Sequence, residues 1–464
     1  MLRKVSWVVL AGSALLASGA RGEDEAAPRV VRLDEARAYA RAHQPMIRAA
    51  LARVAAAQAR AAVPRAQWQP QLGATAQIFV GSTNNTTAEY LGVAQVDLPR
   101  IGGSRVVDAG NATLQPYGST LAAIGISQEV FDFGRIAAQS AAADALAVAA
   151  RHGAEATTLD VDYDVEESFY AVLAAKAVLK ASEDAYERTR THRDFAKAGV
   201  NSRLFEPIEL TRAEADLARF DIGRIRARGG VTTSQAVLAA NVGAPDLELD
   251  ASGDLPGAES IPSLSAALEQ AAARDPRVAE ALAKVRAQEA KTRAIYAEMR
   301  PDLSATATFS GRAGGGPPST GGFSADYDGW VPSVPNWHVG LVFSWPIYDG
   351  SVIARGHASE ADAAAFREDL ASLRQVLNAT VQRAYIDVEV ARDALPGLER
   401  AVTAAVANYA QADARFKAGL GTSIELADAE ALRTEAEINL AMGKFDLVKA
   451  RAGLGRAISE GLTK

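Results

Sequence analysis

The most suggestive chemical pattern in the chain is a run of alternate aspartates, Asp160, Asp162 and Asp164. Carboxylates at alternate positions open a calcium-binding loop, whose sixth position needs a glycine and whose twelfth needs a glutamate that binds the ion with both oxygens. Those two positions hold Val165 and Ala171. The run therefore does not match a calcium loop.

Other patterns of catalytic or cofactor-binding residues are missing as well. The five histidines are scattered without the spacing of a metal site. The Gly-x-Gly pairs at 419–421 and 453–455 lack the third glycine and the preceding strand of a nucleotide-binding loop, and no serine lies in a nucleophile elbow. The absence of cysteine excludes disulfides, thiolate ligands and a lipid anchor on an N-terminal cysteine. We expect no enzymatic activity, no cofactor and no metal.

The first 22 residues have the organisation of a secretory signal peptide. Arg3 and Lys4 precede an apolar run over 5–16, which the small residues 17–20 follow. This run is shorter than the roughly 20 residues that span a bilayer, and no later segment reads as a membrane helix. We therefore expect an exported protein whose contact with a membrane, if it has one, is made by strands.

Composition indicates long, closely packed helices. Hydrophobic residues make up 48% of the chain, but alanine supplies much of this and aromatic residues only 6%. The net charge of -7 and the pI of about 5.5 disfavour a nucleic-acid partner.

The chain is an internal duplication. Residues 33–76 match residues 264–307 at a constant shift of 231 positions, and the motif Lys-Ala-Gly at 197–199 recurs at 417–419. A collinear series of such matches indicates two repeats. We expect the signal peptide at 1–22, a first repeat at 23–243, a connector at 244–262 and a second repeat at 263–464.

Each repeat shows the same predicted order of elements. A helix is followed by a strand, a polar connection, a returning strand, a helix of roughly 60 residues (about 90 Å), a turn and a helix of about 35 residues. The predicted first helices are 33–67 and 264–299, the strands are 71–80, 120–131, 302–311 and 337–348, and the turns lie at Gly199 and Gly419. Pro396 predicts a kink or a joint in the second long helix.

The strands favour a membrane barrel. Strand 337–348 alternates apolar and polar residues over about ten positions, as barrel strands do, although a half-buried strand of a soluble domain has the same pattern. Five aromatic residues near the strand ends are candidates for the membrane interface, namely Phe131, Trp330, Trp337, Trp345 and Tyr348. Four strands cannot close a barrel, because the smallest have about eight. We therefore expect a cyclic oligomer with one shared barrel.

With these motifs assembled, the chain resembles the TolC-like outer-membrane efflux protein family from Leu33 to Ile458. The resemblance rests on Leu-Asp-Glu-Ala at 33–36, Gln-Pro at 44–45, Trp-Pro-Ile-Tyr-Asp-Gly at 345–350 and Phe-Lys-Ala-Gly at 416–419, in this order across two repeats. It implies a homotrimer with a twelve-stranded outer-membrane barrel on a helical periplasmic tunnel. It also implies a passive conduit that works with a periplasmic adaptor and an inner-membrane pump.

The resemblance also suggests site residues. The turns would lie at the periplasmic mouth, where adaptors dock, and include Lys197, Ala198, Gly199, Phe416, Lys417, Ala418 and Gly419. Glu425 and Asp428 match the acidic ring of the family's constriction, with Glu209 as a further candidate. One turn of spacing puts Glu425 and Asp428 on one helix face, where an ordinary solvated surface is the alternative.

The chain departs from the family pattern at the predicted gate. Phe416 has no hydroxyl to bond an acid such as Glu209, and Gly421 stands where an arginine can link the helices. The first turn, 199–206, is also about four residues longer than its counterpart. We expect the usual polar links to be missing or rearranged.

A second reading remains open at this point. A periplasmic coiled-coil adaptor or structural protein without a membrane barrel would explain the helices, with the strands packed in a small soluble domain. An adaptor should have one helical hairpin beside a many-stranded domain, whereas both halves of this chain are equivalent.

Overall fold

The computed structural model describes residues 29–82, 116–253, 255, 260–314 and 334–460. The expected signal peptide at 1–22, Trp330 and most of the connection at 81–119 lie outside these ranges. None of the helices in the described ranges is both long enough and apolar enough to cross a bilayer.

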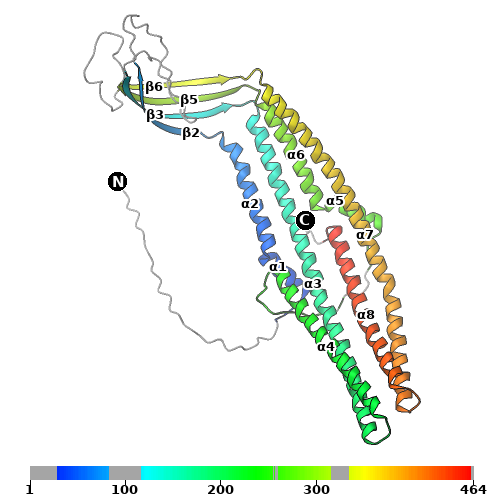
Figure 1. Ribbon diagram of the computed structural model, residues 1–464. Coiled ribbons are helices and arrows are strands. Elements are labelled where there is room, and N and C mark those ends of the chain that lie inside the picture. Colours follow the sequence, from blue (N-terminus) through cyan, green and yellow to red (C-terminus); the bar gives the residue numbers. More distant parts are fainter. Residues whose placement is uncertain (1–28, 83–115, 254, 256–259, 315–333, 461–464) are drawn as a thin grey trace, which may run out of the picture.

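The described elements repeat in the same order in both halves of the chain (Figure 1). The first half contains β1 (Arg29–Val31), α1 (Leu33–His43), α2 (Pro45–Ala66), β2 (Gln71–Ser82), β3 (Pro116–Phe131), α3 (Arg135–Asn201) and α4 (Pro207–Val242). The second half contains β4 (Leu249–Ala251), α5 (Leu264–Arg274), α6 (Pro276–Ala297), β5 (Asp302–Gly314), β6 (Val334–Ser344), α7 (Gly350–Lys417) and α8 (Ser423–Ala457). The expected order of the helices and of the four long strands is confirmed, whereas the short strands β1 and β4 were not predicted.

The first helix of each repeat is broken in two at a proline. Pro45 and Pro276 are the first residues of α2 and α6, and the residues before them, Gln44 and Asp275, are extended. Proline lacks an N–H and disfavours helical backbone in the preceding residue, so the helix must restart there. The single helices predicted over 33–67 and 264–299 were therefore wrong at this point.

An aspartate caps each long helix. Asp132 accepts hydrogen bonds from the backbone N–H groups of Gly134 and Ile136, and Asp349 accepts them from Ser351 (2.8 Å) and Val352 (3.3 Å). Hydrogen bonds from the side chain and the backbone of Ser351 lower the pKa of the Asp349 carboxyl. Each aspartate directly follows the end of a predicted strand, at 131 and 348, and is a helix start signal. The last predicted strand is correspondingly too long, because β6 ends at Ser344.

The long helices are longer than predicted. α3 has 67 residues and α7 has 68, which corresponds to rods of about 100 Å each. α7 runs through Pro396 as one helix, so the expected joint is not present there. The returning helices, of 36 and 35 residues, have the predicted length.

The chain forms three layers along its length (Figure 1). At one end, four antiparallel strands lie in the order β2-β3-β5-β6. Beneath this sheet the helices lie in the order α2-α3-α6-α7, and further down in the order α4-α3-α8-α7. α3 is therefore an inner element of both helical layers and joins the two repeats.

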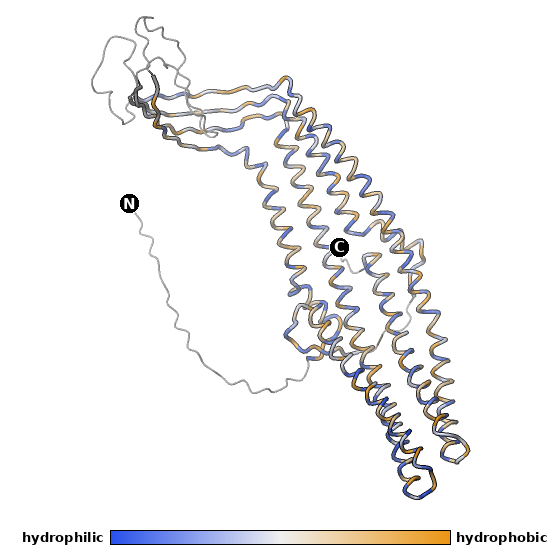
Figure 2. Tube along the Cα trace, in the orientation of Figure 1, coloured by the Kyte–Doolittle hydropathy of each residue, from blue (hydrophilic) through white to orange (hydrophobic). Residues whose placement is uncertain are grey.

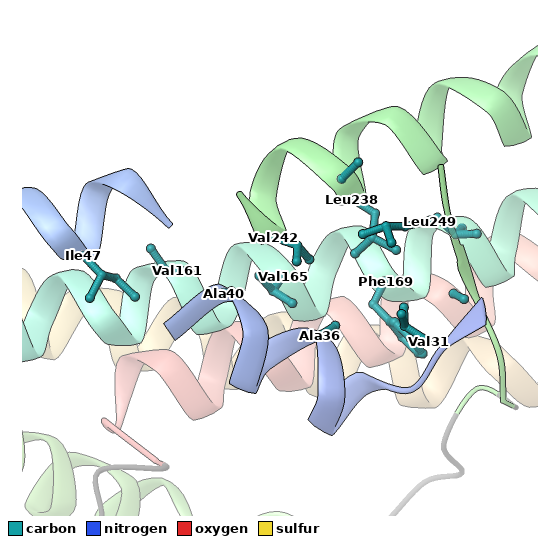
Figure 3. Close-up of a cluster of buried hydrophobic side chains, with 13 residues drawn as sticks. Val31, Ala36, Ala40, Ile47, Val161, Val165, Phe169, Leu238, Val242 and Leu249 are labelled. Carbon is teal, nitrogen blue, oxygen red and sulfur yellow. The ribbon is translucent and has the colours of Figure 1, made fainter. Parts of the chain in front are cut away.

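Small side chains allow the helices to pack closely. One cluster of buried residues joins α1, α3, α4 and the parallel pair β1–β4, around Val165, Phe169 and Leu238 (Figure 3). A second cluster joins α5, α6, α7 and α8 around Val381 and Leu447. Alanine is the commonest buried residue, in agreement with the expectation from composition.

Two of the alternate aspartates form structural ion pairs. Arg41 from α1 binds both oxygens of Asp162 at 2.6 to 3.2 Å, and on another side of α3 the guanidinium of Arg456 from α8 lies 2.6 Å from Asp160. Because these carboxylates lie along a continuous helix, they cannot form a calcium loop. Their cationic partners attach elements of both repeats to α3.

A glycine sets the distance between α6 and α7. A side chain at buried Gly356 would overlap the ring of Tyr296, whereas nothing lies within 4 Å of a Cβ at Gly397 in the same helix. We predict that Gly356→Ala destabilises the fold by about 1–3 kcal/mol through overpacking.

Gly397→Ala is the matched control, since alanine in an open helical position is favoured over glycine by about 1 kcal/mol. Thermal unfolding of the purified protein, followed by circular dichroism, measures both changes. Equal unfolding midpoints for the two variants would contradict this account of the α6–α7 contact.

Candidate functional site: the sheet and the hairpin tips

The four-stranded sheet has an apolar face and a polar face. Ile124, Phe309 and Trp337 lie opposite one another on adjacent strands, and their side chains are 48%, 57% and 72% exposed. On the other face, Thr308 and Ser310 are buried. The alternation of hydrophilic and hydrophobic residues is visible along the strands (Figure 2). An exposed apolar face of this size is what a barrel strand presents to lipid.

The candidate interface aromatics lie at both ends of the strands. Trp337 is near the start of β6, whereas Phe131 ends β3 at the junction with the helices. Trp345 and Tyr348 follow β6 at the same junction and are exposed. Exposed aromatics at both limits of an apolar band are typical of membrane interfaces.

The two helical hairpins end in connections of equal length. Residues 202–206 join α3 to α4, and residues 418–422 join α7 to α8. The four extra residues predicted for the first turn extend the first hairpin along its helices instead. Gly419 has φ +70° and forms its turn as predicted, but Gly199 is a buried residue inside α3. The prediction of a turn at Gly199 was wrong.

Gly199 has a packing role. A Cβ at this position would overlap the ring of Phe205, which folds back over the last turn of α3. The turn itself is made by Arg203, whose φ is +62°. The two copies of the Lys-Ala-Gly motif thus have different local structures: the first ends inside α3, and the second ends in the turn after α7.

The other residues of the predicted turns differ in exposure. Lys197 and Ala198 are exposed on α3, and Lys417 and Ala418 are exposed at the end of α7. Phe416 is only 5% exposed, because its ring packs against α3 and the first connection. The apolar side chains exposed at the two tips are instead Leu204 (78%) and Leu420 (74%), with Ile208 and Ile424 beside them.

The candidate acidic residues lie in different surroundings. Glu425 and Asp428 are exposed on α8, opposite the buried Leu426. Glu425 lies in the first turn, where its backbone N–H donates to the Thr422 hydroxyl. Glu209 is half-buried on α4 and forms an ion pair of 3.0 Å with Arg212. The pairing compensates its charge, in contrast to the other two.

A buried ion pair that was not predicted from the sequence joins the two hairpins. Arg188 of α3 donates three hydrogen bonds to the carboxylate of Glu430 of α8, at 2.8 to 3.0 Å, and Glu430 is 4% exposed. Burial disfavours the charge on Arg188, but the bond to Glu430 outweighs it and raises the pKa of Arg188. Burial, with the negative charge of Glu430, raises the pKa of the neighbouring Tyr409 to about 12. Glu430 follows Leu426 by four residues, so helical periodicity alone places it on the buried face.

The family model described as outer membrane efflux protein matches residues 37–244 and 267–460, one match for each repeat. A comparison with curated proteins gives no significant match.

Several solved outer-membrane channels share the fold. The outer-membrane channel OprN is 20% identical with a TM-score of 0.73, covering 92% of this chain and 90% of its own. The CmeC channel of Campylobacter jejuni is 14% identical with a TM-score of 0.74, covering 92% and 86%. The outer membrane protein VceC of Vibrio cholerae is 16% identical with a TM-score of 0.70, covering 93% and 97%.

The family match extends over most of the chain, and the similar structures cover both the sheet and the helices. These findings do not favour the alternative of an adaptor or a structural coiled coil without a barrel. The chain belongs to the outer membrane efflux protein family: it is a protomer of a TolC-like exit duct, a passive conduit in whose fold three chains share one twelve-stranded barrel.

Proposed function

We propose that the trimer receives its substrate at the hairpin tips from an inner-membrane pump, through a periplasmic adaptor that docks there. We also propose that Glu425 and Asp428 give the entrance a preference for cations. The single observation that carries the second proposal is the exposure of both carboxylates on one face of α8, close to its turn.

The acidic pair acts through its charge. Neither carboxylate takes part in an ion pair among the described residues, in contrast to Glu209 with Arg212. Three copies place six carboxylates around the narrow end of the tunnel. A ring of fixed negative charge raises the local concentration of cations and repels anions.

We predict that Glu425→Gln with Asp428→Asn reduces the cation preference of the channel toward unity. The measurement is the reversal potential of the reconstituted trimer in a planar bilayer under a salt gradient. Asp387→Asn is the matched control, because Asp387 is exposed on α7, far along the helix from the turn. An unchanged permeability ratio in the double variant would exclude these residues from the constriction.

The apolar tips suit adaptor docking. Leu204 and Leu420 occupy corresponding places in the two connections and are largely exposed. Much of the positive charge near the turns is already compensated: Arg193 pairs with Asp194 at 2.8 Å and Lys417 with Asp413 at 2.7 Å. Apolar side chains rimmed by polar residues are the usual centre of a protein interface.

We predict that Leu204→Ala with Leu420→Ala weakens binding of a purified periplasmic adaptor by about tenfold or more, since burying one leucine side chain is worth roughly 1.5–3 kcal/mol. Biolayer interferometry on the intact trimer measures the affinity. Ile222→Ala, on α4 away from the tip, is the control and should bind normally. Wild-type affinity in the double variant would contradict docking on these leucines.

A further inference from the structure

Four aromatic rings from both hairpins meet near the tips, and this group is termed the aromatic clasp. His192 and Phe195 come from α3, Phe205 from the first connection and Phe416 from the last turn of α7. The ring centre of Phe416 lies 4.8 Å from His192, 5.8 Å from Phe205 and 5.9 Å from Phe195. Tilted rings at these distances attract one another beyond the area that they bury.

The clasp joins the two hairpins at their far ends. Phe416 is the one member from the second hairpin; it is almost completely buried, and its ring contacts the three rings of the first hairpin. Phe205 can reach it because residue 199 is glycine and leaves room for the ring. Separating the tips would therefore expose Phe416 to water.

His192 is held in the clasp without a polar partner. No hydrogen bond or ion pair reaches its ring from any of the described residues, and its edge-on neighbour is the ring of Phe416. A neutral imidazole tolerates such a site better than an imidazolium, whose hydration is lost.

Charged groups surround the clasp, but each has a partner of its own. The acids that face His192 are Asp216 and Glu209 on α4 and Asp413 on α7. Asp216 pairs with Arg219 (3.4 Å), Glu209 with Arg212 (3.0 Å) and Asp413 with Lys417 (2.7 Å).

On the remaining sides of His192, Arg188 of α3 is bound to Glu430 of α8, and Tyr409 of α7 lines the same small cavity. The charges around the ring are thus largely balanced.

The direction of the pH effect follows from this balance. Burial lowers the pKa of His192 below its ordinary value, and the three carboxylates offset only part of this. An open state with a hydrated ring keeps the ordinary value of about 6.5 and therefore binds a proton first as the pH falls. The closed clasp is therefore fully stabilised above the pKa of the open state. This stabilisation is lost as the pH falls from the pKa of the open state toward the lowered pKa of the closed state.

We propose that the aromatic clasp is an acid-sensitive latch, which holds the two hairpin tips of a protomer together while His192 is neutral and releases them when the ring takes up a proton. The claim that release widens the entrance of the conduit rests on the proposed function. The claim that the tips separate does not rest on it.

The test measures the distance between the tips directly. The natural chain has no cysteine, so spin labels can be attached uniquely to cysteines at Ala198 and Ala418, which are both exposed. Trimers with one labelled protomer are examined by pulsed electron paramagnetic resonance at about pH 7.5 and about pH 5, on either side of the ordinary histidine pKa. We expect a severalfold rise in the population with separated tips at the lower pH.

Three variants distinguish the latch from general acid effects. His192→Phe and His192→Gln should abolish the pH response, and Phe416→Ala should separate the tips at both pH values. His152→Gln is the matched control, because His152 lies on the same helix but pairs with Glu155 outside the clasp, and it should retain the response.

A response that survives in both His192 variants, or no response in the natural sequence, would overturn the proposal. Bilayer conductance of the same trimers tests the proposed function separately: tips that separate without a rise in current would leave the latch intact and contradict its role at the entrance.

Discussion

Each layer of the protomer has two unpartnered edges, formed by strands in the sheet and by helices below it. The need to cover these edges is the constraint on which the structure depends. Within the described part of the chain, β2 and β6 are each paired on one side only, and α7 is an outer helix of both helical layers, with α2 and α4 opposite it. An unpaired backbone group in lipid costs several kcal/mol, so these edge strands cannot remain open in a membrane. Pairing β6 with β2 of a neighbouring chain removes both edges and brings α7 against the neighbour's α2 and α4. The same operation thus closes barrel and tunnel together.

The position of α3 makes this arrangement possible. It is the inner element that both repeats share: the pairs Arg41–Asp162 and Arg456–Asp160 attach α1 and α8 to its middle, and Arg188 binds Glu430 of α8 lower down. The aromatic clasp joins the hairpins at the tip. Because alanine, with its small and apolar side chain, is the commonest buried residue, polar and aromatic contacts of this kind supply much of the specificity of the tunnel wall.

Much of this architecture could be predicted from the sequence, because a duplication shows every element twice. The repeat order, the four strands and the lengths of the returning helices follow from periodicity and turn residues. Prediction failed where local chemistry was ambiguous. The last strand was predicted to run to Tyr348, although Asp349 next to it caps a helix and β6 ends at Ser344, and Gly199 was assigned to a turn because its motif matches that around Gly419. The contacts of Phe416 and Glu430 could not be predicted, since they join residues far apart in sequence whose meeting depends on how the hairpins align.

The most direct test of the shared barrel is disulfide cross-linking between its edge strands in outer membranes. The natural chain has no cysteine, so each variant carries one cysteine on β6 and one on β2. The positions on β6 are Val339 or Leu341, and those on β2 are Leu72 or Ile78. All four lie on the apolar face and are exposed. Pairing of neighbouring protomers predicts that the pairs in register give covalent species that end at three chains. The absence of cross-links at every register, or a ladder that continues beyond three, would contradict it.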